Sequence, residues 1–398
     1  MRFLFVVPPL AGHTNPAVGV AAELAGRGHD VAWAAHASAL RHLLPPGAVV
    51  YDCGDEFLHE AAGLVEERDG LRGAGALQFL WERFLGPLAR DMAGPVEAAV
   101  AAFSPDVVVA DQQAFAGPVV ADRLALPWVT SASTSGEFVD PLTFAPKVAA
   151  WVADQRDKLL ADLGTPPDRL GQLDPRFSPE LILLYSSEAL TGPLDVPSLR
   201  QVGPVVTGRP AGDFPWEWLD GHGTNVLVSV GTLNTAPGER FVRRTVEALA
   251  DLPVGAVVVA PDGLVDPVPA NVLTRGYVPQ VALLGRVDAV LTHAGHNTVG
   301  EALSYGLPLV VAPIRDDQPI VAGQVVRAGA GVRVSYSRAT PGDIGAAVST
   351  VLADPGYREG ARRVAASFAA AGGAARAADL LESVAPQPGR ALYTGAAR

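Results

Sequence analysis

Short runs of apolar residues alternate along the chain with longer segments in which apolar and polar positions are mixed. The amino-terminal runs "RFLFVVP" and "DVAWAAH" have the continuous apolar character of parallel strands that are buried on both faces. Between them, "NPAVGVAAELAGRGH" predicts a helix that is capped by Thr14 or Asn15, carries Pro16 in its first turn and ends at Gly28. The chain therefore opens with a strand, a loop, a helix and a second strand.

The same unit recurs through the sequence. It returns in "DVVVADQQAFAGPVVADRLALPWVTSA", and "LILLYSSEAL" predicts another buried strand. After the Pro-, Gly- and Asp-rich stretch "QVGPVVTGRPAGDFPWEWLDGHGT" the pattern restarts, with strands in "NVLVSVGT", "GAVVVAP", "NVLTRGYVPQ", "AVLTHAGHN", "PLVVAPIRDDQ" and "AGVRVS". Strands that alternate with helices predict open, mostly parallel α/β sheets. We expect two Rossmann-like, doubly wound domains that face each other across a cleft: residues 1–205 and 223–375, with a linker at 206–222 and a carboxyl-terminal helix and tail at 376–398.

Two segments of the first half are less regular. Phe79, Trp81 and Phe84 are predicted to pack in a helical core, with a pocket lining as the alternative. Residues 138–179 mix proline, glycine, aspartate and aromatic residues with weak periodicity, so we expect irregular helices and loops at the rim of the domain.

Composition narrows the class of protein. A length of 398 residues with 49% hydrophobic residues is enough for two buried cores. A net charge of -12 without a basic run argues against nucleic acid as a partner. Cys53 is the single cysteine, which precludes an internal disulfide and indicates a reducing compartment. No apolar run approaches the length of a membrane span, so a cytoplasmic location without integral membrane association is expected.

The most informative motif is "AVLTHAGHNTVGEALSYG", which places a polar cluster between a buried strand and a helix. Free N–H groups and the helix dipole at such a position attract phosphate. Gly295 lets the backbone approach a ligand closely, Asn297 and Thr298 offer short hydrogen-bonding side chains, and His293 can donate to a phosphate oxygen. The alternative is a capped helix with incidental histidines.

A longer segment contains this motif. From Tyr277 to Gln318 the chain reads "YVPQVALLGRVDAVLTHAGHNTVGEALSYGLPLVVAPIRDDQ". The segment resembles the sugar-nucleotide signature of family-1 glycosyltransferases, the GT-B enzymes that glycosylate natural products. The resemblance implies a nucleotide-sugar site in the second domain. In this site, Tyr277 and Val278 would contact the base, Gln280 and Glu301 the ribose, and Asp317 and Gln318 the sugar. The diphosphate would be bound by His293, Gly295, His296, Asn297 and Thr298.

Simpler roles for some of these residues stay open. Tyr277 could pack against a strand, Glu301 could be an acid in the first turn of a helix, and the Asp317–Gln318 pair could form a surface turn. A tyrosine platform is smaller than the family's tryptophan, so the resemblance leaves open whether the base is uracil or thymine. His296 replaces the tryptophan that plant members carry, and the role of its side chain is open too.

A second turn completes the implied donor site. In "VSVGTLN", Ser229, Gly231 and Thr232 follow the first strand of the second domain. The resembled family uses a Ser-x-Gly-Thr/Ser turn at this point to contact donor phosphate or sugar. A routine strand-to-loop glycine turn is the alternative.

The first domain supplies candidates for catalysis. "PPLAGHTNP" lacks the three glycines of a dinucleotide fingerprint, and it places His13 at the end of the first strand. An alcohol needs a base with a pKa near 7, which imidazole provides. The resemblance aligns His13 with the family's catalytic histidine. We also expect Gly12, in the same motif, to bind the donor. Asp111 ends another strand and is predicted to orient the imidazolium; it could instead cap the next helix.

Together these features predict an inverting glycosyltransferase. A UDP- or dTDP-sugar would donate to a hydroxyl of a hydrophobic small-molecule acceptor, such as a secondary metabolite. No metal or other cofactor is expected, because the helix amino terminus and His293 would stabilise the leaving diphosphate. Residues 57–179 match the family least and are expected to select the acceptor. A sugar-nucleotide epimerase or hydrolase on the same fold and a non-catalytic binding protein are the alternatives, and a homodimer stays open.

Overall fold

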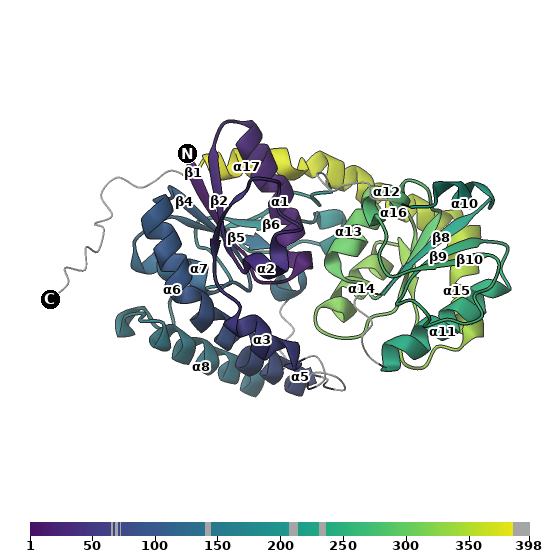
Figure 1. Cartoon of the computed structure of the whole chain (residues 1–398), viewed down its shortest axis with the longest axis horizontal. Coiled ribbons are helices and arrows are strands. Elements are labelled where there is room, and N and C mark those ends of the chain that lie inside the picture. Colours follow the sequence, from purple (N-terminus) through teal and green to yellow (C-terminus); the bar gives the residue numbers. More distant parts are fainter. Residues whose placement is uncertain are drawn as a thin grey trace.

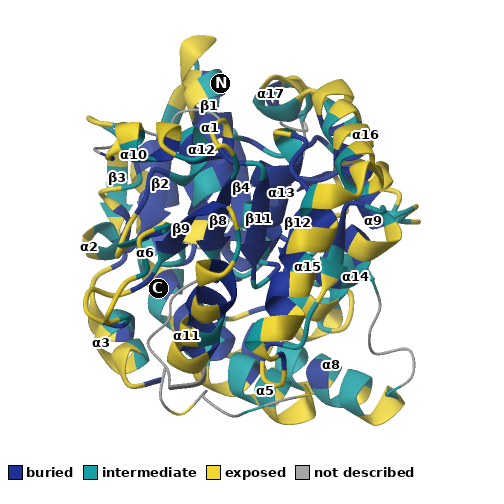
Figure 2. Ribbon diagram, turned by 90° about the vertical axis from the view of Figure 1, so that its right-hand side faces the viewer, coloured by how far each residue is buried: buried dark blue, intermediate teal, exposed yellow. Residues whose placement is uncertain are grey.

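The computed structural model describes residues 1–64, 67, 71, 73–139, 145–206, 214–230 and 236–384. Two parallel β-sheets, one in each half of the chain, form its framework (Figure 1). Helices pack on the sheets, and Figure 2 shows the strands buried beneath helices whose outer surfaces are exposed. The predicted fold class, two Rossmann-like domains of the α/β type, is confirmed.

The first sheet has the order β3-β2-β1-β4-β5-β6-β7, and all neighbouring strands in it are parallel. Its central strands are wholly buried because apolar cores cover both faces. The chain order reverses between β1 and β4, which places a ligand-binding switch point beyond the carboxyl ends of these two strands. The strands are β1 (Arg2–Val6), β2 (Asp30–Ala35), β3 (Val49–Asp52), β4 (Val107–Asp111), β5 (Trp128–Ala132), β6 (Ile182–Leu184) and β7 (Leu199–Gln201).

The second sheet repeats this plan with the order β10-β9-β8-β11-β12-β13. Its neighbouring strands are also parallel, and its switch point lies between β8 and β11. The strands are β8 (Asn225–Ser229), β9 (Gly255–Val259), β10 (Val272–Arg275), β11 (Ala289–Thr292), β12 (Leu309–Val311) and β13 (Gly331–Arg333).

Helices connect the strands and cover the sheets. In the first half they are α1 (Ala11–Gly26), α2 (Ala37–Leu40), α3 (Glu56–Ala62), α5 (Gly73–Phe79), the π-helix η1 (Leu80–Leu85), α6 (Gly86–Phe103), α7 (Ala116–Arg123), the 3₁₀ turns η2 (Gly136–Phe138) and η3 (Pro167–Arg169), α8 (Pro146–Asp162) and α9 (Glu188–Thr191). In the second half they are α10 (Trp216–Asp220), α11 (Ala236–Ala250), α12 (Gln280–Leu284), α13 (His296–Ser304), α14 (Gln318–Arg327), α15 (Pro341–Ala353), α16 (Pro355–Ala371) and α17 (Gly373–Glu382). Within the described ranges, each helix is too short or too polar to cross a lipid bilayer.

Helix α1 begins earlier than predicted, at Ala11 rather than after a cap at Thr14 or Asn15. The N–H groups of His13 and Thr14 both donate to the carbonyl of Leu10, at 3.0 Å each, so the first turn closes before Pro16 is reached. Pro16 therefore lies inside the helix. The consequence is that His13 belongs to the first turn of a helix and not to a loop.

Residues 146–162, in the region expected to be irregular, form the regular 17-residue helix α8. Its apolar stripe is narrow, because Val152, Leu159 and Leu160 alone among its residues are fully buried, which explains the weak periodicity. Val152 and Leu159 pack with Trp81 in a small hydrophobic cluster, so the prediction that Trp81 serves a helical core is confirmed.

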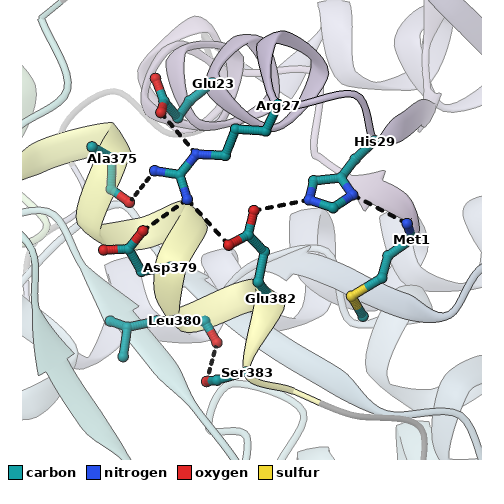
Figure 3. A network of polar contacts seen from close by, with 9 residues as sticks. All are labelled: Met1, Glu23, Arg27, His29, Ala375, Asp379, Leu380, Glu382 and Ser383. Atoms are coloured by element: carbon teal, nitrogen blue, oxygen red, sulfur yellow. Dashed lines mark hydrogen bonds and ion pairs between the residues drawn. The ribbon is translucent and has the colours of Figure 1, made fainter.

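Helix α17 returns from the second half of the chain to the first domain, where it packs on α1 (Figure 1). Polar contacts around Arg27 hold it there (Figure 3). The Arg27 guanidinium donates to the Asp379 carboxylate at 2.7 Å, and His29 bridges the Met1 amine and the Glu382 carboxylate at 3.1 and 2.8 Å. The two ends of the described chain are thereby tied to each other.

Candidate active site

His13, Asp111 and Ser133 meet at the carboxyl edge of the first sheet. The Nδ1 atom of His13 lies 2.9 Å from Oδ1 of Asp111 and 2.7 Å from Oγ of Ser133. The three residues follow or end β1, β4 and β5, which are adjacent parallel strands. A carboxylate at Nδ1 favours the tautomer with its proton on that nitrogen, so Nε2 keeps a lone pair that can accept a proton.

Asp111 is fully buried, and its contacts explain its orientation. Oδ1 also accepts the backbone N–H of Gln113 at 2.8 Å, and Oδ2 has no hydrogen-bond partner in the part of the chain that the structure describes. The alternative that Asp111 caps the next helix is wrong, because α7 begins at Ala116 and Phe115 occupies its N-cap position.

The charges around His13 favour its protonated form. Burial acts to lower the pKa of His13, but the negative charges of Asp111, Asp317 and Glu137 outweigh burial and raise this pKa above its ordinary value of 6.5. Asp317 belongs to the second domain. The imidazolium is thus stabilised by carboxylates from both halves of the chain.

The polar cluster after β11 folds as a tight turn into α13. Ala294 has φ of 68°, and Gly295 occupies the N-cap position of the helix. The ring of His293 lies across Gly295, since a Cβ at residue 295 would stand 2.6 Å from its Nε2. Burial lowers the pKa of His293 despite a hydrogen bond to the backbone of Ser229, and this favours the neutral ring.

The two residues predicted to hold a ribose are hydrogen-bonded to each other. Nε2 of Gln280, at the start of α12, donates to Oε2 of Glu301 at 2.6 Å. Glu301 is the sixth residue of α13, so the alternative of a first-turn acid is wrong. Tyr277 is 80% exposed, which likewise excludes packing against a strand. Val278 is buried, and its carbonyl accepts the N–H of Gln280 at 2.8 Å.

Other predicted donor residues lie where the domains touch. The Asn297 amide donates to the Gly12 carbonyl, and the buried His296 places Nε2 3.3 Å from the Tyr185 carbonyl. The Thr134 hydroxyl donates to the Asp317 carboxylate.

The remaining predicted residues are placed as follows. Oε1 of Gln318 accepts the N–H groups of Ile314 and Arg315 at 2.9 and 3.1 Å. Ser229 ends β8 and Thr298 is half-buried in the first turn of α13. Gly231 and Thr232 lie outside the described residues.

The loop after β5 was not predicted as part of the site. Besides Ser133 and Thr134, it brings Oγ of Ser135 to 2.9 Å from Oε1 of Gln324 in α14. Its signal in the sequence is the run Ser-Thr-Ser-Gly directly after a buried strand, at the sheet edge that already carried His13 and Asp111.

Gly136 provides a test of this domain contact. A Cβ at residue 136 would lie 2.7 Å from Cβ of Asp317, so Gly136→Ala is expected to push the loop away from α14 and lower kcat by about 10-fold or more. Steady-state kinetics would measure the effect. Gly94→Ala is the matched control, since a Cβ there meets nothing within 4 Å, and its kcat should be unchanged. Wild-type turnover in Gly136→Ala would show that the contact is dispensable.

Two facing Rossmann-like domains, with a histidine at one switch point and a helix amino terminus at the other, define the GT-B class of sugar-transferring enzymes. Residues 243–383 match the family described as erythromycin biosynthesis protein CIII-like, C-terminal domain. The chain belongs to the family-1 glycosyltransferases of natural-product pathways, and the expected enzyme class is confirmed.

Two relatives and one solved structure are similar to this chain over nearly its whole length. The 4'-demethylrebeccamycin synthase of Lentzea aerocolonigenes is 31% identical over 96% of this chain and 99% of its own length. The demethyllactenocin mycarosyltransferase of Streptomyces fradiae is 30% identical over 96% of this chain and 86% of its own. The crystal structure of the glycotransferase of kitacinnamycin superposes with a TM-score of 0.75 at 27% identity, covering 97% of this chain and 99% of that one.

Proposed function

We propose that the chain transfers a sugar from a UDP- or dTDP-sugar to a hydroxyl of a hydrophobic small-molecule acceptor, with inversion at the anomeric carbon. The observation that carries the proposal is the contact of His13 with Asp111, 2.9 Å apart, because His13 belongs to a helix turn that touches the first turn of α13. A base and a phosphate-attracting helix end are thereby neighbours across the domain boundary.

In the proposed reaction, Nε2 of His13 takes the proton of the acceptor hydroxyl. The oxygen attacks the anomeric carbon, and the bond from this carbon to the diphosphate oxygen breaks as the new bond forms. Asp111 stabilises the imidazolium that results, and Ser133 gives the ring a second contact at Nδ1. Each step uses groups that the chain itself provides.

The leaving diphosphate would lie at the amino terminus of α13, where unpaired N–H groups and the helix dipole stabilise negative charge. His293 stands beside this turn, and burial lowers the pKa of its ring. The charge of a diphosphate would favour the protonated ring, which can then donate to a phosphate oxygen. The proposed route therefore needs no metal ion.

The base of the nucleoside would lie on the exposed ring of Tyr277, and the ribose would contact the Gln280–Glu301 pair. The Gln280 amide donates to the buried Glu301 carboxylate, and the ribose hydroxyls of a bound nucleotide would take over this hydrogen bond. The names of the relatives from Lentzea and Streptomyces support a secondary-metabolite acceptor.

Glu301→Ala tests the donor site. Loss of hydrogen bonds from ribose to a charged carboxylate is expected to weaken the affinity for a nucleoside diphosphate by about 10-fold or more. Calorimetric titration with UDP and dTDP would measure Kd. Glu247→Ala, which removes an exposed acid of α11 in the same domain, is the control and should bind like the wild type. Equal affinity in both variants would remove Glu301 from the donor site.

A further inference from the structure

The first turns of α1 and α13 are linked by one hydrogen bond across the domain boundary. The side-chain amide of Asn297 donates to the carbonyl oxygen of Gly12, the residue before His13. A Cβ at residue 12 would lie 3.7 Å from the same amide nitrogen, so the amide sits directly on the turn that carries the proposed base. Pro16 and Asn297 also line one small pocket between the domains, together with His296 and Glu301.

Pro16 explains why this carbonyl is available. In an α-helix the carbonyl of residue 12 would accept the N–H of residue 16, but proline has none. The neighbouring carbonyl of Leu10, in contrast, accepts the N–H groups of His13 and Thr14 and the hydroxyl of Thr14 at 3.1 Å. The helix interior thus leaves Gly12 without its usual donor, and a side chain of the other domain supplies one.

We propose that Asn297 is a positioning residue for sugar transfer, which sets the base-bearing turn at a defined place relative to the donor helix. This inference rests on the proposed function. Asp111 and Ser133 orient the His13 ring within the first domain, whereas the sugar would be held by the second. The hydrogen bond from Asn297 to Gly12 connects the two domains at the residue that precedes His13, the proposed base. The side-chain amide of Asn297 then belongs to the domain contact, and the backbone N–H groups of the turn remain for phosphate.

The proposal predicts a separation of kcat from binding. Asn297→Ala should lower kcat by about 10-fold or more, because small displacements of a reacting group are costly. It should leave Kd for UDP and dTDP within about twofold, measured by calorimetry. A raised Kd with unchanged kcat would instead assign the side chain to the diphosphate, and no change in either quantity would also overturn the proposal.

Pro16→Ala separates positioning from stability. In Asn297→Ala the Gly12 carbonyl loses its donor, which lowers Tm as well as kcat. Adding Pro16→Ala gives the carbonyl an N–H within the helix, so the double variant should regain Tm but not kcat. Recovery of kcat along with Tm would show a purely structural role. Failure of the proposed function is a distinct result, since it would appear as full turnover in a His13 variant.

Discussion

Replacing His13 by alanine is expected to lower kcat by about 10²- to 10⁴-fold, the usual contribution of a general base. The acceptor hydroxyl loses the group that takes its proton, while the residues proposed to hold the donor lie in the second domain. Kd for the nucleoside diphosphate should therefore stay within about twofold of the wild type. Turnover with a competent acceptor and calorimetric titration would measure the two quantities.

His42→Ala is the matched control for this experiment. His42 is an exposed histidine of the same domain, beyond α2, and its replacement should leave both quantities unchanged. Near wild-type turnover in His13→Ala would refute the base assignment. Loss of nucleotide binding in the same variant would mean that His13 supports the donor site or the fold instead.

The second large effect is expected for Asp111→Asn, which should lower kcat on the order of 10²-fold and shift the pH profile. Asp111 raises the pKa of His13, so in the wild type the base becomes neutral, and the rate rises, only above an elevated pKa. Removal of the carboxylate charge lowers this pKa, and the acidic limb of the pH–rate profile moves to lower pH. The maximal rate falls because the imidazolium formed during transfer loses its partner.

Asp91→Asn provides the comparison for the pH profile. Asp91 pairs with the buried His36 at 2.9 Å in the same domain, so the change removes a similar carboxylate from another histidine. The acidic limb of the pH–rate profile of Asp91→Asn should coincide with that of the wild type. If the acidic limb of the pH–rate profile does not shift in Asp111→Asn, or shifts equally in Asp91→Asn, the His13–Asp111 pair does not control the pH dependence of the rate.

The fold was largely predictable because parallel strands buried on both faces need continuous apolar runs. Segments such as "RFLFVVP" and "AVLTHAGHN" therefore located the strands, and strand ends located the switch points. The start of α1 was not predictable in the same way. Pro16 suits a first helical turn by local rules, and its place deeper in the helix is accommodated by a donor from a distant segment.

Contacts between the domains could not be predicted from local sequence patterns. Asn297 and Gly12 are 285 positions apart, and nothing near either residue indicates that they meet. The same holds for Thr134 and Asp317, whose hydrogen bond depends on how the two sheets face each other. The carboxyl-terminal helix is another case, since its apolar stripe indicates that it packs but not on which domain.

The proposed mechanism requires the diphosphate of the donor to lie at the amino terminus of α13, across the domain boundary from His13. A crystal structure of the chain with UDP or dTDP bound would locate the diphosphate. We expect the base on Tyr277, the ribose on Glu301, and the diphosphate at the Gly295–Thr298 turn with its terminal phosphate on the side of His13. A nucleotide seated in the first domain, or a diphosphate turned away from α13, would contradict the proposed mechanism.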